Sequence, residues 1–173
     1  AKNAAGNYRI PEGTSAIDDN AFENAQVSTV TMPTTLRTIG AQAFAHSRLT
    51  QLTLPDGLRS AGTWAFAYTT NLTSVDLGGI TALPDGAFIG SSSLAEVNFR
   101  PDLAALTTIG EDAFDWTSLT SATLPDTVTT IADNAFANNT ALTSLHLGAG
   151  VTSIGATALG GTPSLASLSV SPA

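Results

Sequence analysis

The sequence has no cysteine, few charged residues and no long apolar run. Without cysteine there is no disulfide, no thiolate metal site and no cysteine nucleophile. Charged residues make up 12% of the chain, and a net charge of -8 argues against nucleic acid as a partner because phosphates would be repelled. No apolar stretch approaches the roughly 18 residues that a membrane helix needs, so membrane insertion is not expected.

Thr, Ser, Ala and Gly take the place of the missing charged residues, so we expect a surface made largely of small, neutral side chains. Hydrophobic residues make up 43% of the 173 residues, which is enough for one folded domain with a sizeable core. The chain starts at Ala1 without a methionine and shows no signal peptide. We therefore expect it to be a fragment of a larger protein.

A short apolar pattern, L-x-x-V-x-L, recurs along the chain at spacings of 22, 23, 22, 25, 23 and 23 residues. Its first positions are Val27, Leu49, Leu72, Leu94, Leu119, Leu142 and Leu165. A second pattern consists of pairs of apolar residues five positions apart, with an alanine directly before the second residue of each pair. The pairs are Ile17/Phe22, Ile39/Phe44, Ala61/Phe66, Leu83/Phe88, Ile109/Phe114, Ile131/Phe136 and Ile154/Leu159. Two linked patterns predict stacked repeats that share one core.

Each repeat is expected to hold one strand and one short turn. Residues 145–147 alternate apolar, polar and apolar, which indicates a strand with one buried face. Residues 131–136 have apolar positions spaced for a single helical turn, with Asp133 placed to cap it. Three other turns carry an equivalent aspartate, at Asp19, Asp85 and Asp112. The prediction is an α/β repeat solenoid of about seven repeats: a right-handed coil with one parallel β-sheet on the concave side and helical or 3-10 turns on the convex side.

These repeats resemble the BspA-type leucine-rich repeats of bacterial surface proteins. The resemblance covers residues 8–170 and is carried by units such as residues 119–142. The family usually has Gly-Cys a few residues after the phenylalanine, where this chain has Tyr68-Thr69, Trp116-Thr117 and Asn138-Asn139. The resemblance implies an exported adhesion or interaction module at the bacterial cell surface. No catalytic residues are conserved with the repeat, so neither an enzyme activity nor a cofactor is implied.

We expect a single leucine-rich-repeat domain over residues 1–173. It divides into an N-terminal half repeat at 1–26, six full repeats at 27–164 and a terminal strand at 165–173. No polar cap follows that strand, so a further repeat or a cap is expected in the parent protein. The chain alone should be a monomer or associate weakly through this edge. The longest unit, 94–118, has its extra residues near 101–105.

No catalytic or metal-binding set is recognised in the sequence. His46 and His146 lie four to five repeats apart, too far to share a ligand. The carboxylate pairs at 18–19 and 111–112 have the spacing of turn caps, which favours a structural role. We therefore predict no catalytic residues, no metal ligands and no cofactor.

The predicted binding site is a polar patch on the concave sheet. Short hydroxyl side chains fill most outward strand positions, but carboxylates and an amide interrupt them at Asp76, Glu96 and Asn98. These side chains could hold a cation or bond to a sugar. Arg100 lies at the edge of the patch, and Gln51 and His146 are outlying contacts.

An alternative site lies two residues after each phenylalanine, where Tyr68 and Trp116 stand in place of glycine. Trp116 could instead cover the lengthened loop of its own repeat. The expected function is a non-catalytic extracellular module that adheres to a host or matrix protein or to a glycan. The alternatives are a spacer that presents another domain, or an accessory domain of a larger surface enzyme. Binding to ice is disfavoured, because Gln51 and Asp76 interrupt the threonine columns.

Overall fold

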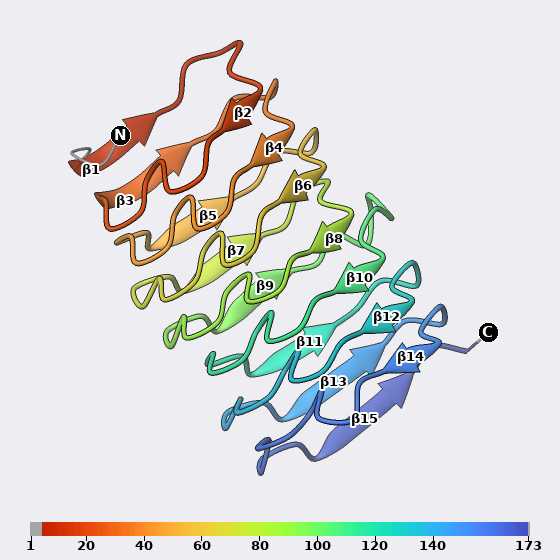
Figure 1. The fold of residues 1–173 in the computed structure, drawn as a ribbon. Helices are drawn as coiled ribbons and strands as arrows, with labels where there is room; N and C mark the ends of the chain where they lie inside the picture. The colour runs from red at the N-terminus through yellow and green to blue at the C-terminus, as the bar shows by residue number, and fades with distance from the viewer. Residues whose placement is uncertain (1–4, 173) are drawn as a thin grey trace.

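A computed structural model describes residues 5–172 and shows a stack of parallel strands with no helix in that range. Long and short strands alternate along the chain and form two rows, with the two ends of the chain at opposite ends of the stack (Figure 1). The first row, called the long-strand face, contains β1 (Ala5–Arg9), β3 (Gln26–Thr31), β5 (Gln51–Thr53), β7 (Ser74–Asp76), β9 (Glu96–Asn98), β11 (Ser121–Thr123), β13 (Ser144–Leu147) and β15 (Ser167–Val170). The second row contains β2 (Ala16–Ile17), β4 (Thr38–Ile39), β6 (Ser60–Ala61), β8 (Ala82–Leu83), β10 (Thr108–Ile109), β12 (Thr130–Ile131) and β14 (Ser153–Ile154).

The parallel solenoid predicted from the repeats is confirmed, with about seven turns. Residues 1–4 of the expected half repeat and residue 173 of the expected terminal strand lie outside the described residues. The division of the chain into a half repeat, six repeats and a terminal strand stays a prediction.

The prediction of one continuous sheet is wrong, because the long-strand face consists of three ladders: β1–β3, β5–β7–β9 and β11–β13–β15. Inside the middle ladder, Leu54 N donates to Asp76 O at 2.9 Å and Leu77 N to Asn98 O at 3.1 Å. The ladder stops after β9, where the longest repeat turns away through Arg100 and Ala104, at φ values of 50° and 47°. The extra residues of this repeat thus lie at one of the two interruptions of the sheet, and the other, between β3 and β5, has no insertion.

A stack of phenylalanine rings fills the core, as the second pattern predicts. Each ring is at most 4% exposed, neighbouring centroids are 4.8–5.6 Å apart and the ring planes differ by only 4–16°. Tyr8 meets the first ring, Phe22, edge-on at 5.3 Å. The stacked rings are Phe22, Phe44, Phe66, Phe88, Phe114 and Phe136.

The predicted helical or 3-10 turns around each phenylalanine are wrong, since two residues of each turn have a left-handed backbone. These residues lie two before and two after the phenylalanine, for example Gln42 (φ 52°) and His46 (φ 56°) around Phe44. A right-handed helix requires negative φ throughout. The N–H groups of these three residues point to the next repeat, where Phe44 N donates to Ala65 O at 2.7 Å.

The aspartates predicted to cap those turns bond to the neighbouring repeat instead. Asp19 Oδ1 accepts from Ala41 N at 2.7 Å, and Asp85 Oδ1 accepts from Glu111 N at 2.9 Å. Asp112 is itself one of the left-handed residues, with φ 54°. Without a helix there is no N-terminus to cap, and the first two carboxylates join adjacent repeats.

A column of buried polar side chains follows the left-handed residue, at the position where the family usually has cysteine. It contains Ser47, Thr69, Ser91, Thr117 and Asn139, all at most 6% exposed. Thr69 Oγ1 donates to Phe66 O at 2.9 Å, and Asn139 Nδ2 donates to Phe114 O at 2.8 Å. Glycine is common just before this position because the backbone there is left-handed. This chain has Tyr68, Trp116 and Asn138 there, with φ values of 55°, 56° and 53°.

Within residues 5–172, the strand β15 pairs only with β13 and leaves its other edge open. Leu168 and Val170 are 55% and 60% exposed, and Ile154 of the short-strand row beside it is 47% exposed. The apolar edge expected at residues 165–170 is therefore present. Weak self-association through it stays a prediction.

Replacing a ring inside the stack should be costly. Phe88→Ala leaves a cavity between Phe66 and Phe114, and we expect it to lower the free energy of unfolding by about 3–5 kcal/mol. Denaturant unfolding measures the change, with Thr123→Ala on the exposed side of β11 as the control. A loss below about 1 kcal/mol would mean that the stack is not the main core contact.

Replacing a glutamine whose backbone is left-handed should stabilise the protein. Gln42→Gly removes a side chain from a backbone with φ 52°, and we expect the free energy of unfolding to rise by about 0.5–1 kcal/mol. The same substitution in strand β5, Gln51→Gly, is the matched control and should lower it by a similar amount. Equal losses in both variants would contradict the left-handed assignment.

Candidate functional site

Three adjacent strands line a shallow hollow on the long-strand face, called the sheet hollow. The register of β5, β7 and β9 aligns Gln51, Ser74 and Glu96 in one row. Thr53, Asp76 and Asn98 form the next row, on the same outward side because strand side chains alternate. The hollow has a volume of about 250 Å³. Four of the six predicted site residues line it: Gln51, Asp76, Glu96 and Asn98.

Arg100, the fifth predicted residue, is held by three carboxylates at the end of β9. Its Nη1 lies 2.9 Å from Asp56 Oδ1 and 3.2 Å from Asp76 Oδ1, and its Nη2 lies 3.0 Å from Asp102 Oδ2. The hydrogen bonds to Asp102 and Asp76 raise the pKa of Arg100, and the bond from Arg100 lowers the pKa of Asp102. With its side chain only 18% exposed, Arg100 acts first as a clamp between β7, β9 and the loops around them.

Asp76 and Asn98 use most of their hydrogen-bonding capacity inside the protein. Asp76 Oδ1 accepts from Gly78 N at 2.9 Å, and Asp76 Oδ2 accepts from Asn98 Nδ2 at 3.0 Å. Asn98 Oδ1 accepts in turn from Arg100 N at 3.1 Å. By contrast, Gln51 and Glu96 are exposed, and their side chains have no hydrogen bond or ion pair to any residue in 5–172. These two side chains are the ones free to contact a ligand.

His146, the sixth predicted residue, lies on β13 in a different ladder and does not line the sheet hollow. Its Nδ1 lies 2.8 Å from Ser169 Oγ and its Nε2 lies 3.0 Å from Ser171 Oγ. Both ring nitrogens therefore already have partners on the terminal strand and just after it.

The alternative aromatic site is not brought together. Tyr68 stacks on His46 at 5.0 Å and 10°, and a Cβ on Gly90 would come within 2.4 Å of the other side of the tyrosine ring. Both faces of Tyr68 are thus covered. Trp116 is 60% exposed and stands two repeats further on, beyond the turn that contains Gly90.

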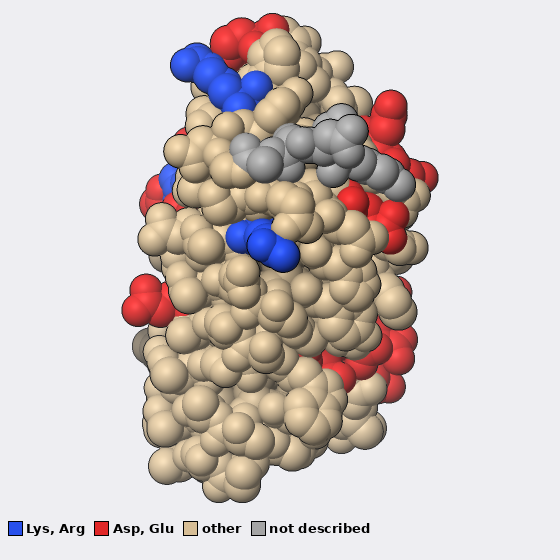
Figure 2. All heavy atoms as spheres, turned by 90° about the vertical axis from the view of Figure 1, so that its left-hand side faces the viewer, with Lys and Arg blue, Asp and Glu red and all other residues tan. Residues whose placement is uncertain are grey.

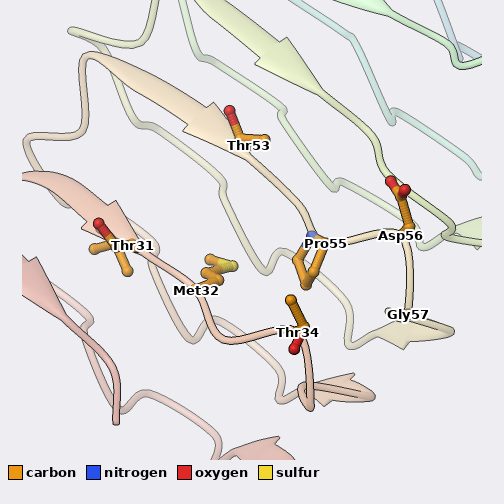
Figure 3. A pocket seen from close by; sticks show the side chains of 8 residues that line it. Thr31, Met32, Thr34, Thr53, Pro55, Asp56 and Gly57 are labelled. Atoms are coloured by element: carbon orange, nitrogen blue, oxygen red, sulfur yellow. The ribbon is translucent and has the colours of Figure 1, made fainter. Parts of the chain in front are cut away.

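Sequence reasoning missed two other hollows. One, the strand-end hollow, lies between the ends of β3 and β5 and has a volume of about 460 Å³. Figure 3 shows the side chains of Met32 and Pro55, which follow the two strands, and those of Thr31 and Thr53 at the strand ends. It lies where the ladder between β3 and β5 is interrupted, which no residue pattern signals.

The other, the edge hollow, has a volume of about 520 Å³ and lies where β5 and β7 start. Its lining residues are His46, Ser47, Arg48, Tyr68, Thr70 and Asn71. The signal in the sequence was the side-chain column after the phenylalanines, which includes His46. The alternative site predicted from that column included only Tyr68 and Trp116.

No group of three or more histidine, cysteine, aspartate or glutamate residues within 5–172 is arranged to hold a metal ion. The same residues contain no helix that could cross a bilayer. The sheet hollow therefore offers hydrogen bonds and charge to a ligand, and no cation-binding cluster.

Parallel strands stacked in repeats of 22–25 residues around a phenylalanine core define a leucine-rich-repeat solenoid. The chain belongs to the BspA type leucine-rich repeat family, whose model matches residues 2–108 and 107–172 in six copies. No curated protein matches the sequence. The fold and the family are typically non-catalytic, and such repeats of surface proteins suggest a protein-interaction module.

Solved structures of bacterial leucine-rich-repeat proteins share the fold. One from Bacteroides ovatus is 25% identical over 92% of this chain, with a TM-score of 0.70. The T. pallidum leucine-rich repeat protein is 24% identical over 86% of this chain and 72% of its own length, with a TM-score of 0.75. A leucine rich cell surface protein from Faecalibacterium prausnitzii is 20% identical over 96% of this chain and 60% of its own length, with a TM-score of 0.51. The chain spans 47% of the Bacteroides protein, less than half of its length.

The Arg100 clamp should make stability depend on pH on the acid side. Because Arg100 lowers the pKa of Asp102, the pair stabilises the fold above the unfolded carboxyl pKa of about 3.9 and stops doing so as the pH falls through the lower folded pKa. We expect Arg100→Gln to lower the melting temperature at pH 7 by roughly 2–4 °C, with the difference shrinking below about pH 4.

Thermal unfolding followed by circular dichroism between pH 2.5 and 7 measures this difference. Arg9→Gln is the control, since Arg9 lies 3.9 Å from Glu12 with both side chains more than half exposed. A difference that stays constant over the whole range would show that Arg100 acts by packing alone.

Proposed function

We propose that the chain is a non-catalytic binding module of a bacterial surface protein, which adheres to a protein or glycan ligand of a host or matrix through the sheet hollow. The observation that carries the proposal is the contrast between two sets of side chains in that hollow. Asp76 and Asn98 are tied to Arg100, while Gln51 and Glu96 on the same strands are exposed and unpaired.

A rigid support favours recognition because fixed side chains lose little freedom on binding. Strands β5, β7 and β9 are joined in one ladder, and the three carboxylates on Arg100 hold the strand ends together. Glu96 offers a charged acceptor, and Gln51 offers both a donor and an acceptor. Serine and threonine hydroxyls surround them, so a partner that presents basic or hydrogen-bonding groups fits this surface.

The family supports a location outside the cell, because BspA-type repeats occur in surface proteins and one structural neighbour is described as a cell surface protein. A non-catalytic role agrees with the family and fold. We propose a monomer that associates at most weakly through the exposed β15.

A second candidate function is a spacer that presents another domain, favoured by the continuous stack of six phenylalanine rings. A stacked core with backbone bonds between repeats makes a stiff rod. A spacer, however, needs no free polar side chains in a hollow, which is what separates the two functions in an experiment.

The test measures binding of the purified chain to immobilised matrix proteins and to a glycan array. Substitutions then locate the surface that contacts any ligand found. We expect the double variant Gln51→Ser, Glu96→Ser to weaken the positive interaction at least tenfold, or about 1.4 kcal/mol, without a change in melting temperature. Neither side chain has an internal partner to lose.

Glu111→Ser, an exposed glutamate on a turn, is the charge-matched control and should bind normally. Undiminished binding by the double variant would place the contact elsewhere. No binding in either format would favour the spacer.

A further inference from the structure

The edge hollow is separate from the sheet hollow and faces the side of the molecule from which the long strands start. Figure 2 looks at that side: neutral side chains make up most of it, acidic ones gather along its edges and basic ones are sparse. The hollow is formed by two consecutive repeats, with His46, Ser47 and Arg48 from one and Tyr68, Thr70 and Asn71 from the next. A volume of about 520 Å³ is within the usual range for small-molecule sites.

Arg48 is the one arginine in residues 5–172 whose side chain has no partner. Arg37 and Arg59 donate to backbone carbonyls of their own turns, at 2.8 Å to Thr34 O and 3.0 Å to Asp56 O. Arg9 lies near Glu12, and Arg100 is held by three carboxylates. In a chain with net charge -8, an exposed guanidinium without a carboxylate beside it is an open position for an anion.

Ser47 belongs to the lining of the hollow but does not offer its hydroxyl to a ligand. It lines the edge hollow, is 4% exposed, and its Oγ is the one buried side-chain polar atom in the described chain that lacks a hydrogen-bond partner. One repeat further on, the equivalent Thr69 Oγ1 donates to Phe66 O. Ser47 Oγ is likewise enclosed by the protein, so a ligand in the hollow does not reach this hydroxyl.

The rest of the lining offers neutral donors and acceptors beside an aromatic wall. Thr70 and Asn71 are exposed, and their side chains make no hydrogen bond within residues 5–172. His46 and Tyr68 stack on one another at 5.0 Å, which fixes both rings in place as one wall of the hollow. A hydroxyl and an amide beside a cation suit a ligand that carries several hydroxyl groups and one carboxylate.

We propose that the edge hollow binds an acidic sugar, with the carboxylate of the sugar on Arg48 and its hydroxyl groups on Thr70 and Asn71. The guanidinium supplies a charge-assisted hydrogen bond to the carboxylate. The donor-rich lining favours a sugar over a simple carboxylic acid, because the hydroxyl groups add bonds that the acid lacks. This site does not depend on the sheet hollow and stands whether or not the proposed adhesive surface is correct.

The experiment is a titration of the isotope-labelled chain with D-glucuronate, followed by the NMR shifts of the backbone amides. D-glucose and acetate are matched probes, since one lacks the carboxylate and the other lacks the sugar. We expect glucuronate to shift the amides of residues 46–48 and 68–71 and to bind at least tenfold more tightly than either probe. Arg48→Gln should weaken glucuronate binding at least tenfold, while Ser47→Ala and Arg9→Gln should not change it.

Equal binding of glucose or of acetate would overturn the proposal, as would shifts confined to the sheet hollow or no shift at all. Tighter binding of a short glutamate peptide than of glucuronate would also overturn it, in favour of a peptide site. The double variant Gln51→Ser, Glu96→Ser separates this test from that of the proposed function: it should leave glucuronate binding unchanged. A melting temperature of Arg48→Gln equal to that of the unchanged protein confirms that any loss is local.

Discussion

The alternation of hydrogen bonds in each turn is the constraint on which the solenoid depends. Around Phe44, the N–H groups of Gln42, Phe44 and His46 donate to the next repeat, at 3.0, 2.7 and 2.9 Å, while Ala45 donates within its own turn. The left-handed residues make this alternation feasible because they reverse the direction of successive N–H groups. Neighbouring repeats are thus joined by backbone bonds directly around each phenylalanine, and the rings stack 4.8–5.6 Å apart as a result.

The repeats in the sequence predicted the parallel strands, their register and the buried phenylalanine column, because each of these follows from which side chains are apolar. The turns were predicted wrongly for a related reason. Apolar residues five apart, as in Ile131 and Phe136, fit one turn of helix equally well. The left-handed positions at Gln42, Trp64 and Tyr68 carry none of the glycine that normally signals them.

The candidate site was predictable to the extent that it depends on strand register. Gln51 and Glu96 share a row because the repeats align them. The clamp was not predictable, since Arg100 reaches Asp56, which lies 44 residues earlier, and that contact depends on the path of one irregular loop. The edge hollow was also not predictable from the sequence, because the lack of a partner for Arg48 becomes visible only when the partners of all neighbouring side chains are known.

The column two residues after each phenylalanine has a consequence for how such a module can change its specificity. Its backbone bonds are made to the next repeat whatever the side chain, and in this chain it already holds asparagine, histidine, tyrosine, tryptophan and glycine, at φ values of 53–68°. A substitution there alters what the edge of the solenoid presents without altering the ladder beneath it. The repeat is in this sense a fixed frame in which this position accepts different side chains, so new recognition surfaces can arise by point mutation along the rod, except at Gly90, where a Cβ would come within 2.4 Å of Tyr68.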